Sequence, residues 1–134
     1  VMRCFEAGAI ATGAKLDVFG AEFAYAEMKS DEEIAAYYRQ NAEALGRRFP
    51  DLNPRAAEAA GSTDMGNVSL AVPSIHPMIG IDSLPAVNHQ PEFTAHCITE
   101  AADRACMDGA VAMAWTAIDC ANDVHLGERL LASR

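Results

Sequence analysis

The sequence predicts an α/β fold, and three observations carry that prediction. Apolar residues recur at helical spacing from Val1 to Thr12, alternate with a period of two over Lys15–Met28, and return to helical spacing after Ser30. A short apolar run, Met78–Ile81, then lies between two polar loops, and a long alanine-rich helical pattern, Thr99–Ala121, follows it. Helix and strand patterns therefore alternate along the chain, as they do in α/β proteins.

The first two elements differ in period. Val1, Phe5 and Ala9 share one face of the expected first helix, and Gly13 is expected to end it because glycine readily adopts the left-handed conformation. Lys15–Met28 is expected to be a strand, because one of its two alternating residue sets is rich in aromatic side chains.

The later helices carry recognisable ends. Ser30 is expected to be the N-cap of a helix that continues to Leu45, because three acidic residues follow it and carboxylates favour a helix N-terminus. Gly46 is expected to end this helix. The methionines and the tryptophan of Thr99–Ala121 are expected to pack in the core, and Leu126–Leu131 predicts a short final amphipathic helix.

The composition limits the classes of function. The 134 residues carry a net charge of −9, and the ten basic residues are scattered, which argues against nucleic acid and anionic membrane surfaces as partners. No apolar run is long enough to span a bilayer. The four cysteines form no Cys-x-x-Cys pair, and we expect a reducing, cytoplasmic setting.

Candidate site residues lie in the two polar loops. His89 follows Asn88 and precedes Pro91; it is either a metal ligand, since zinc accepts imidazole nitrogen, or a surface residue that caps the next helix. Gly61–Asp64 either binds a substrate carboxylate through N–H and O–H donors or forms a turn and helix cap. His76 either faces the same pocket or packs. A catalytic zinc needs about three protein ligands, and no second ligand stands at an obvious partner spacing.

Both loops resemble segments of a known family. Residues 61–69 read Gly-Ser-Thr-Asp-Met-Gly-Asn-Val-Ser, residues 72–77 read Val-Pro-Ser-Ile-His-Pro, and residues 88–93 read Asn-His-Gln-Pro-Glu-Phe. In this order they resemble the C-terminal part of the zinc-dependent aminoacylase and carboxypeptidase-like metallopeptidases. Within that family they are most similar to the amidohydrolase branch, which includes p-aminobenzoyl-glutamate hydrolase and the dipeptidases acting on β-alanyl or γ-aminobutyryl dipeptides. Ala112–Asp119 resembles the closing helix of the family.

The resemblance implies a fold and a domain division. The family has an α/β/α sandwich catalytic domain that is interrupted by a smaller α+β lid, through which the protein dimerises. Residues 1–29 would be the last helix and strand of the lid and dimerisation domain. Residues 30–134 would be the C-terminal part of the catalytic domain, and the start at Val1 would fall inside the lid.

The resemblance also implies site residues and a reaction. His89 matches the last metal ligand, and Gly61, Ser62, Thr63 and Asp64 match the loop that lines the substrate pocket, with His76 a weaker match. The cofactor would be zinc, with manganese or cobalt as alternatives, and the reaction would be metal-assisted hydrolysis of a small amide or dipeptide by a homodimer. The alternative is a non-catalytic truncated fragment, or a dimerisation or binding module, that lacks the full metal site.

Overall fold

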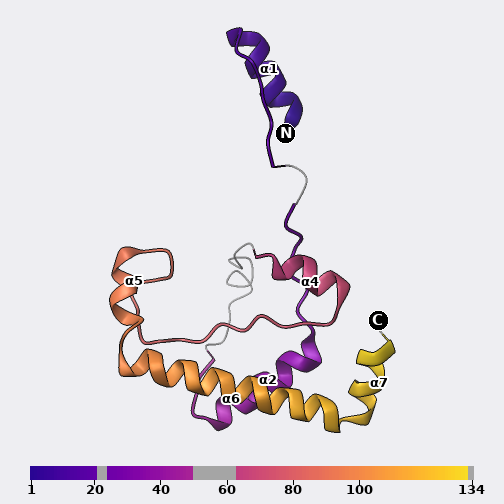
Figure 1. Cartoon of the computed structure of the whole chain (residues 1–134), viewed down its shortest axis with the longest axis vertical. Helices are drawn as coiled ribbons and strands as arrows, with labels where there is room; N and C mark the ends of the chain where they lie inside the picture. The colour runs from indigo at the N-terminus through magenta and orange to yellow at the C-terminus, as the bar shows by residue number, and fades with distance from the viewer. Residues whose placement is uncertain (21–23, 50–62, 133–134) are drawn as a thin grey trace.

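A computed structural model describes residues 1–20, 24–49 and 63–132 of the chain. Six helices are defined in these ranges, and they are labelled as in Figure 1. They are α1 (Met2–Thr12), α2 (Glu32–Ala44), α4 (Met65–Ala71), α5 (Pro91–His96), α6 (Glu100–Asn122) and α7 (Val124–Ala132). None of these helices is long and apolar enough to cross a membrane.

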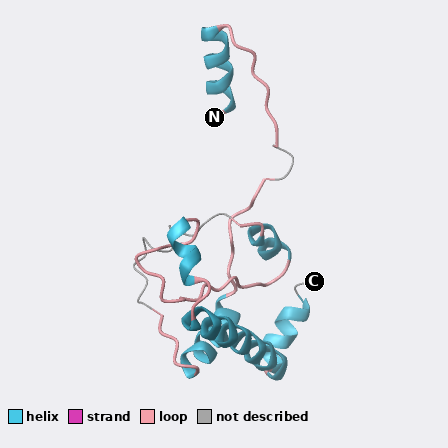
Figure 2. Ribbon diagram, turned by 60° about the vertical axis from the view of Figure 1, so that its left-hand side comes forward, coloured by secondary structure: helices cyan, strands magenta, loops and turns pink. Residues whose placement is uncertain are grey.

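The described residues contain no β-strand (Figure 2). The described parts of Lys15–Met28 are loop, and Met78–Ile81 is also without assigned structure, so both strand predictions are wrong at these positions. The one pairing found there is an isolated parallel bridge between Ser30 and Ser74. Alternating apolar residues favour an extended chain, but a strand also needs a hydrogen-bonded neighbour. The α/β/α sandwich stays a prediction.

The helix ends follow local sequence signals with one correction. Gly13 ends α1 in the left-handed conformation, with φ of 67°, as expected. The N-cap of α2 is Asp31 and not Ser30: the Asp31 carboxylate accepts a hydrogen bond from Ile34 N at 3.1 Å. Ser30 instead takes part in the bridge to Ser74. Thr99 caps α6, its hydroxyl oxygen accepting from Ala102 N at 3.2 Å.

The core lies between α2 and α6. Tyr38 and Ala42 of α2 pack against Ala112 of α6, and Leu45, Phe49 and Ile75 cover this cluster. Tyr38 meets Phe49 edge to face, with ring centroids 6.5 Å apart. Because the central contacts are made by alanines, the two helices can approach closely.

Polar side chains extend the contact between α2 and α6 toward the C-terminal end of α6. Asn41 Nδ2 donates hydrogen bonds to Asp119 Oδ2 at 2.7 Å and to Thr116 Oγ1 at 3.3 Å. At the other end of the contact, Arg47 forms an ion pair with Asp108 at 2.7 Å. These three polar side chains of α6 thus face α2 and Arg47. Its methionines and tryptophan are exposed, contrary to the expectation that they fill the core; these residues are Met107, Met113 and Trp115.

The segment that follows α4 runs extended across the α2–α6 layer (Figure 1). Ile75, Pro77 and Ile79 are half-buried, whereas the residues between them, His76 and Met78, are exposed. Ile75 contacts the core. The segment therefore has the alternation of a strand with one packed face, and His76 lies on the opposite face.

Candidate functional site

The predicted substrate loop leads directly into α4. Gly61 and Ser62 lie outside the described residues, so the structure bears only on Thr63 and Asp64. Asp64 occupies the N-cap position of α4, but its carboxylate accepts no hydrogen bond from the helix. Thr63 Oγ1 accepts from Met65 N at 3.3 Å and lies 3.4 Å from Asp64 Oδ1. Thr63 therefore satisfies a helix amide, as the helix-cap alternative for Gly61–Asp64 requires, and the Asp64 carboxylate is exposed to solvent.

His89 stands in an unusual backbone conformation. Its φ is 66°, in the left-handed region that costs most non-glycine residues about 1 kcal/mol or more. Val87 N donates to Gln90 Oε1 at 3.1 Å, which closes the turn around His89. Gln90, and not His89, is the N-cap of α5. The capping interpretation of His89 is therefore wrong.

The imidazole of His89 is exposed, and no hydrogen bond or ion pair joins it to another described residue. Backbone strain often persists where a side chain must be presented in a particular direction. Because the imidazole of His89 is exposed, it has the accessibility that a metal ligand needs.

The remaining histidines are placed on separate elements. His76 lies on the outer face of the extended segment, His96 is half-buried in the last turn of α5, and His125 is exposed on α7. Within the described ranges, no group of three or more His, Cys, Asp or Glu side chains could hold a metal ion. The described residues therefore fit zinc only in part, because their histidines lie on separate elements and a catalytic zinc needs about three protein ligands.

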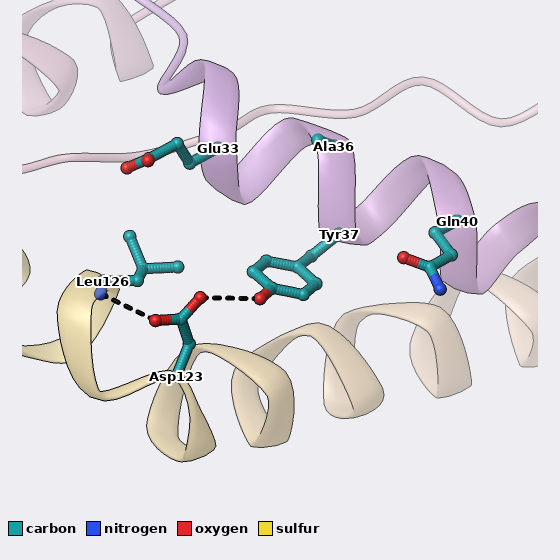
Figure 3. Close-up of a pocket in the computed structure, with 6 residues that line it drawn as sticks. All are labelled: Glu33, Ala36, Tyr37, Gln40, Asp123 and Leu126. Atoms are coloured by element: carbon teal, nitrogen blue, oxygen red, sulfur yellow. Dashed lines mark hydrogen bonds between the residues drawn. The ribbon is translucent and has the colours of Figure 1, made fainter.

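A cavity of about 270 Å³ lies between α2 and the junction of α6 with α7 (Figure 3). Asp123 lies at its edge, and both carboxylate oxygens already accept hydrogen bonds, from the Tyr37 hydroxyl at 2.7 Å and from Leu126 N at 3.0 Å. The bond to Asp123 raises the pKa of Tyr37, and the Leu126 N–H and the Tyr37 hydroxyl lower the pKa of Asp123. Both pKa values therefore move away from neutral pH. The hydrogen bond between Tyr37 and Asp123 links α2 to the end of α6.

A second polar cluster joins α7 to the start of α2. Arg129 donates to both oxygens of Asp31, at 2.8 and 2.9 Å, and its Nε lies 2.6 Å from Glu33 Oε2. The hydrogen bond from Arg129 lowers the pKa of Asp31, with burial opposing it. No local sequence pattern indicates this cluster, because Arg129 lies 98 positions after Asp31.

Comparison with known proteins provides two related sequences. The chain is 36% identical over 118 residues to a protein named Xaa-Arg dipeptidase from Mus musculus, covering 87% of this chain and 27% of the relative. It is 34% identical over 116 residues to the Homo sapiens protein of the same name, covering 87% and 26%. Both relatives are dipeptidases by name.

The chain spans about a quarter of the length of these curated relatives. No family model matches the sequence, and no solved structure matches it. The similarity therefore agrees with the metallopeptidase resemblance at the level of a peptidase that cleaves dipeptides, and it goes no further.

Proposed function

We propose that this chain is the C-terminal portion of a metal-dependent amidohydrolase or dipeptidase, which cleaves the amide bond of N-acyl amino acids or dipeptides. The observation that carries the proposal is the similarity to two Xaa-Arg dipeptidases across 87% of the chain. That similarity is joined by the two loop motifs, Gly61–Ser69 and Asn88–Phe93, in the order expected for the family.

His89 is the proposed metal ligand. Its imidazole is exposed and makes no hydrogen bond to another described residue, so its ring nitrogens are accessible to a metal ion. The left-handed backbone at this position sets the direction of the side chain. A bound zinc, manganese or cobalt ion would activate a water molecule and polarise the amide carbonyl. The further ligands would come from outside the described residues.

Thr63 and Asp64 are the proposed substrate contacts within the described part of the loop. Thr63 offers a hydroxyl that is half-buried, and Asp64 offers an exposed carboxylate. A carboxylate attracts a cationic group of a substrate, which suits a dipeptide with a basic residue such as the relatives' name describes. Gly61, Ser62 and His76 keep their place as proposed contacts on the family resemblance.

Residues 1–29 are the proposed end of a lid through which the whole protein forms a homodimer. Figure 1 draws α1 apart from the other helices, and none of its residues is buried. A helix with Phe5 and Ile10 exposed to solvent suits a segment that packs against other parts of a larger protein.

The test compares two histidines in the longer protein that contains this chain. His89→Ala should remove most bound zinc and lower the hydrolysis of an Xaa-Arg dipeptide by at least a hundredfold. The control, His125→Ala, changes an exposed histidine of α7 that has no proposed role, and it should leave both quantities unchanged. Normal zinc content and turnover in His89→Ala would refute the assignment.

A second measurement addresses the chain of 134 residues alone. Because its described residues offer one proposed ligand, it should bind zinc weakly and without fixed stoichiometry. Isothermal titration with zinc measures this directly. A tight one-to-one complex would mean that this chain holds a complete site.

A further inference from the structure

Helix α4 holds a segment of the chain that lies 40 residues earlier. Asn67 Oδ1 accepts a hydrogen bond from Ala26 N at 2.9 Å, and Asn67 Nδ2 donates one to Ala24 O at 3.2 Å. A neighbouring strand of a parallel sheet makes the same pair of bonds, to the carbonyl before a residue and to the N–H after it. The Asn67 carboxamide therefore replaces a strand partner for this extended segment.

Two further residues of the same helix complete the contact. Ser69 Oγ accepts from Lys29 N at 2.9 Å and donates to Gly66 O at 2.7 Å. Gly66 is buried, and a Cβ at this position would lie 2.0 Å from Ala26 O. Only glycine allows the backbone of the segment to approach so closely. We call Gly66, Asn67 and Ser69 the α4 anchor.

The α4 anchor lies between two features of the proposed enzyme. Its helix begins directly after Thr63 and Asp64, the described residues of the proposed substrate loop. The segment it holds, residues 24–29, connects the part of the chain that carries α1 to α2; Figure 2 shows this connection passing beside α4. Helix α4 therefore contacts residues 24–29 and directly follows the Thr63–Asp64 loop.

We propose that Asn67, Ser69 and Gly66 are positioning residues, which fix the connection between the α1 part and the rest of the protein relative to the Thr63–Asp64 loop. The effect on substrate rests on the proposed function. The physical contact does not, because it consists of hydrogen bonds within this chain. Breaking the hydrogen bonds of the α4 anchor should change the position of residues 1–29 relative to the Thr63–Asp64 loop, and so weaken substrate binding. It should leave the proposed metal ligand His89 unaffected.

The first test is amide hydrogen exchange in the full chain. Asn67→Ala should speed exchange of the Ala26 amide at least tenfold, and Ser69→Ala should do the same for the Lys29 amide, with amides of α2 and α6 unchanged. Leu70→Ala, an exposed residue of the same helix, is the matched control and should change none of them. Unchanged exchange at Ala26 and Lys29, or faster exchange throughout the chain, would overturn the proposal.

A conservative variant separates the two bonds of Asn67. In Asn67→Asp at neutral pH the carboxylate can still accept from Ala26 N–H but cannot donate to Ala24 O. Exchange of the Ala26 amide reports the first bond, so it should stay slow in Asn67→Asp and speed up in Asn67→Ala. Equal acceleration in the two variants would contradict a direct bond between the Asn67 side chain and Ala26 N–H.

The second test uses the longer protein and its proposed dipeptidase activity. Asn67→Ala should raise KM for a dipeptide at least fivefold, with kcat within twofold and zinc content unchanged. Equal KM values in the two proteins, or loss of zinc, would overturn the positioning role. If the unmodified protein hydrolyses no dipeptide, the proposed function fails, and the exchange experiment still decides whether the anchor exists.

Discussion

Replacing glycine by alanine should have opposite effects on stability at two glycines that lie within helices. Gly109 lies in the middle of α6, and a Cβ there would meet Ile79 Cδ1 at 3.5 Å, an ordinary van der Waals distance. Gly66 lies in α4, and a Cβ there would overlap Ala26 O at 2.0 Å. Alanine should therefore stabilise the protein at Gly109 and destabilise it at Gly66.

The magnitudes follow from the contacts. Replacing a helix-interior glycine by alanine contributes about 1 kcal/mol, so Gly109→Ala should raise the free energy of unfolding by about that amount. Gly66→Ala must displace the backbone of residues 24–29, which breaks three hydrogen bonds to Asn67 and Ser69. At about 1 kcal/mol each, and with a helix-propensity gain of up to about 1 kcal/mol, the net loss is about 2 kcal/mol.

The assay is thermal and urea unfolding followed by circular dichroism at the helix band. For a chain of this size, 1 kcal/mol corresponds to a shift in Tm of about 4 °C, so the two variants should melt about 12 °C apart. A Gly66→Ala protein that melts with or above the unmodified protein would refute the reasoning. It would mean that residues 24–29 move aside without cost and that the three hydrogen bonds contribute no stability.

Three further predictions concern stability. Leu126→Ala should cost about 3 kcal/mol in urea unfolding, because Leu126 is the largest fully buried side chain among the described residues, whereas Leu131→Ala, at a 63% exposed position, should cost little. Arg129 lowers the pKa of Asp31, so the Asp31 carboxylate stabilises the folded state fully above about pH 4, and this stabilisation is lost as pH falls through the folded-state pKa. The difference in the free energy of unfolding between the unmodified protein and Asp31→Asn should therefore shrink on acidification. His89→Gly should be about 1 kcal/mol more stable than His89→Ala in the same unfolding assay, since glycine tolerates the positive φ; equal stabilities would remove the strain argument.

The positions of α1, α2, α6 and α7 could be predicted from the sequence because their signals are local, whereas α4 and α5 lie in the stretch that we expected to be mostly loop. Gly13 and Thr99 mark ends of α1 and α6 through their own backbone preference and side-chain oxygen. The error at Ser30 shows the limit of such signals. Two neighbouring residues could both cap α2, and a contact with Arg129, 98 residues away, accompanies the choice of Asp31.

The strands and the candidate site depend on distant partners and could be predicted only in part. Alternation over Lys15–Met28 and the apolar run Met78–Ile81 favoured extended chain, but neither pattern could supply the hydrogen-bonded neighbour that a strand needs. The sequence singled out His89 from its loop and its motif, but not the positive φ that sets its direction. The anchor role of Asn67 was also hidden, because its partners lie about 40 residues earlier.

The polar contacts between α2 and the last two helices have a consequence for how the protein is made. Asn41 bonds a residue 78 positions later, Tyr37 one 86 positions later, and Asp31 one 98 positions later. A ribosome synthesises α2 long before any of these partners exists. Until Ala112 emerges, α2 lacks its α6 partner, so the packing around Tyr38 cannot be complete, and loss of Arg129 by premature termination would leave the start of α2 without its cationic partner.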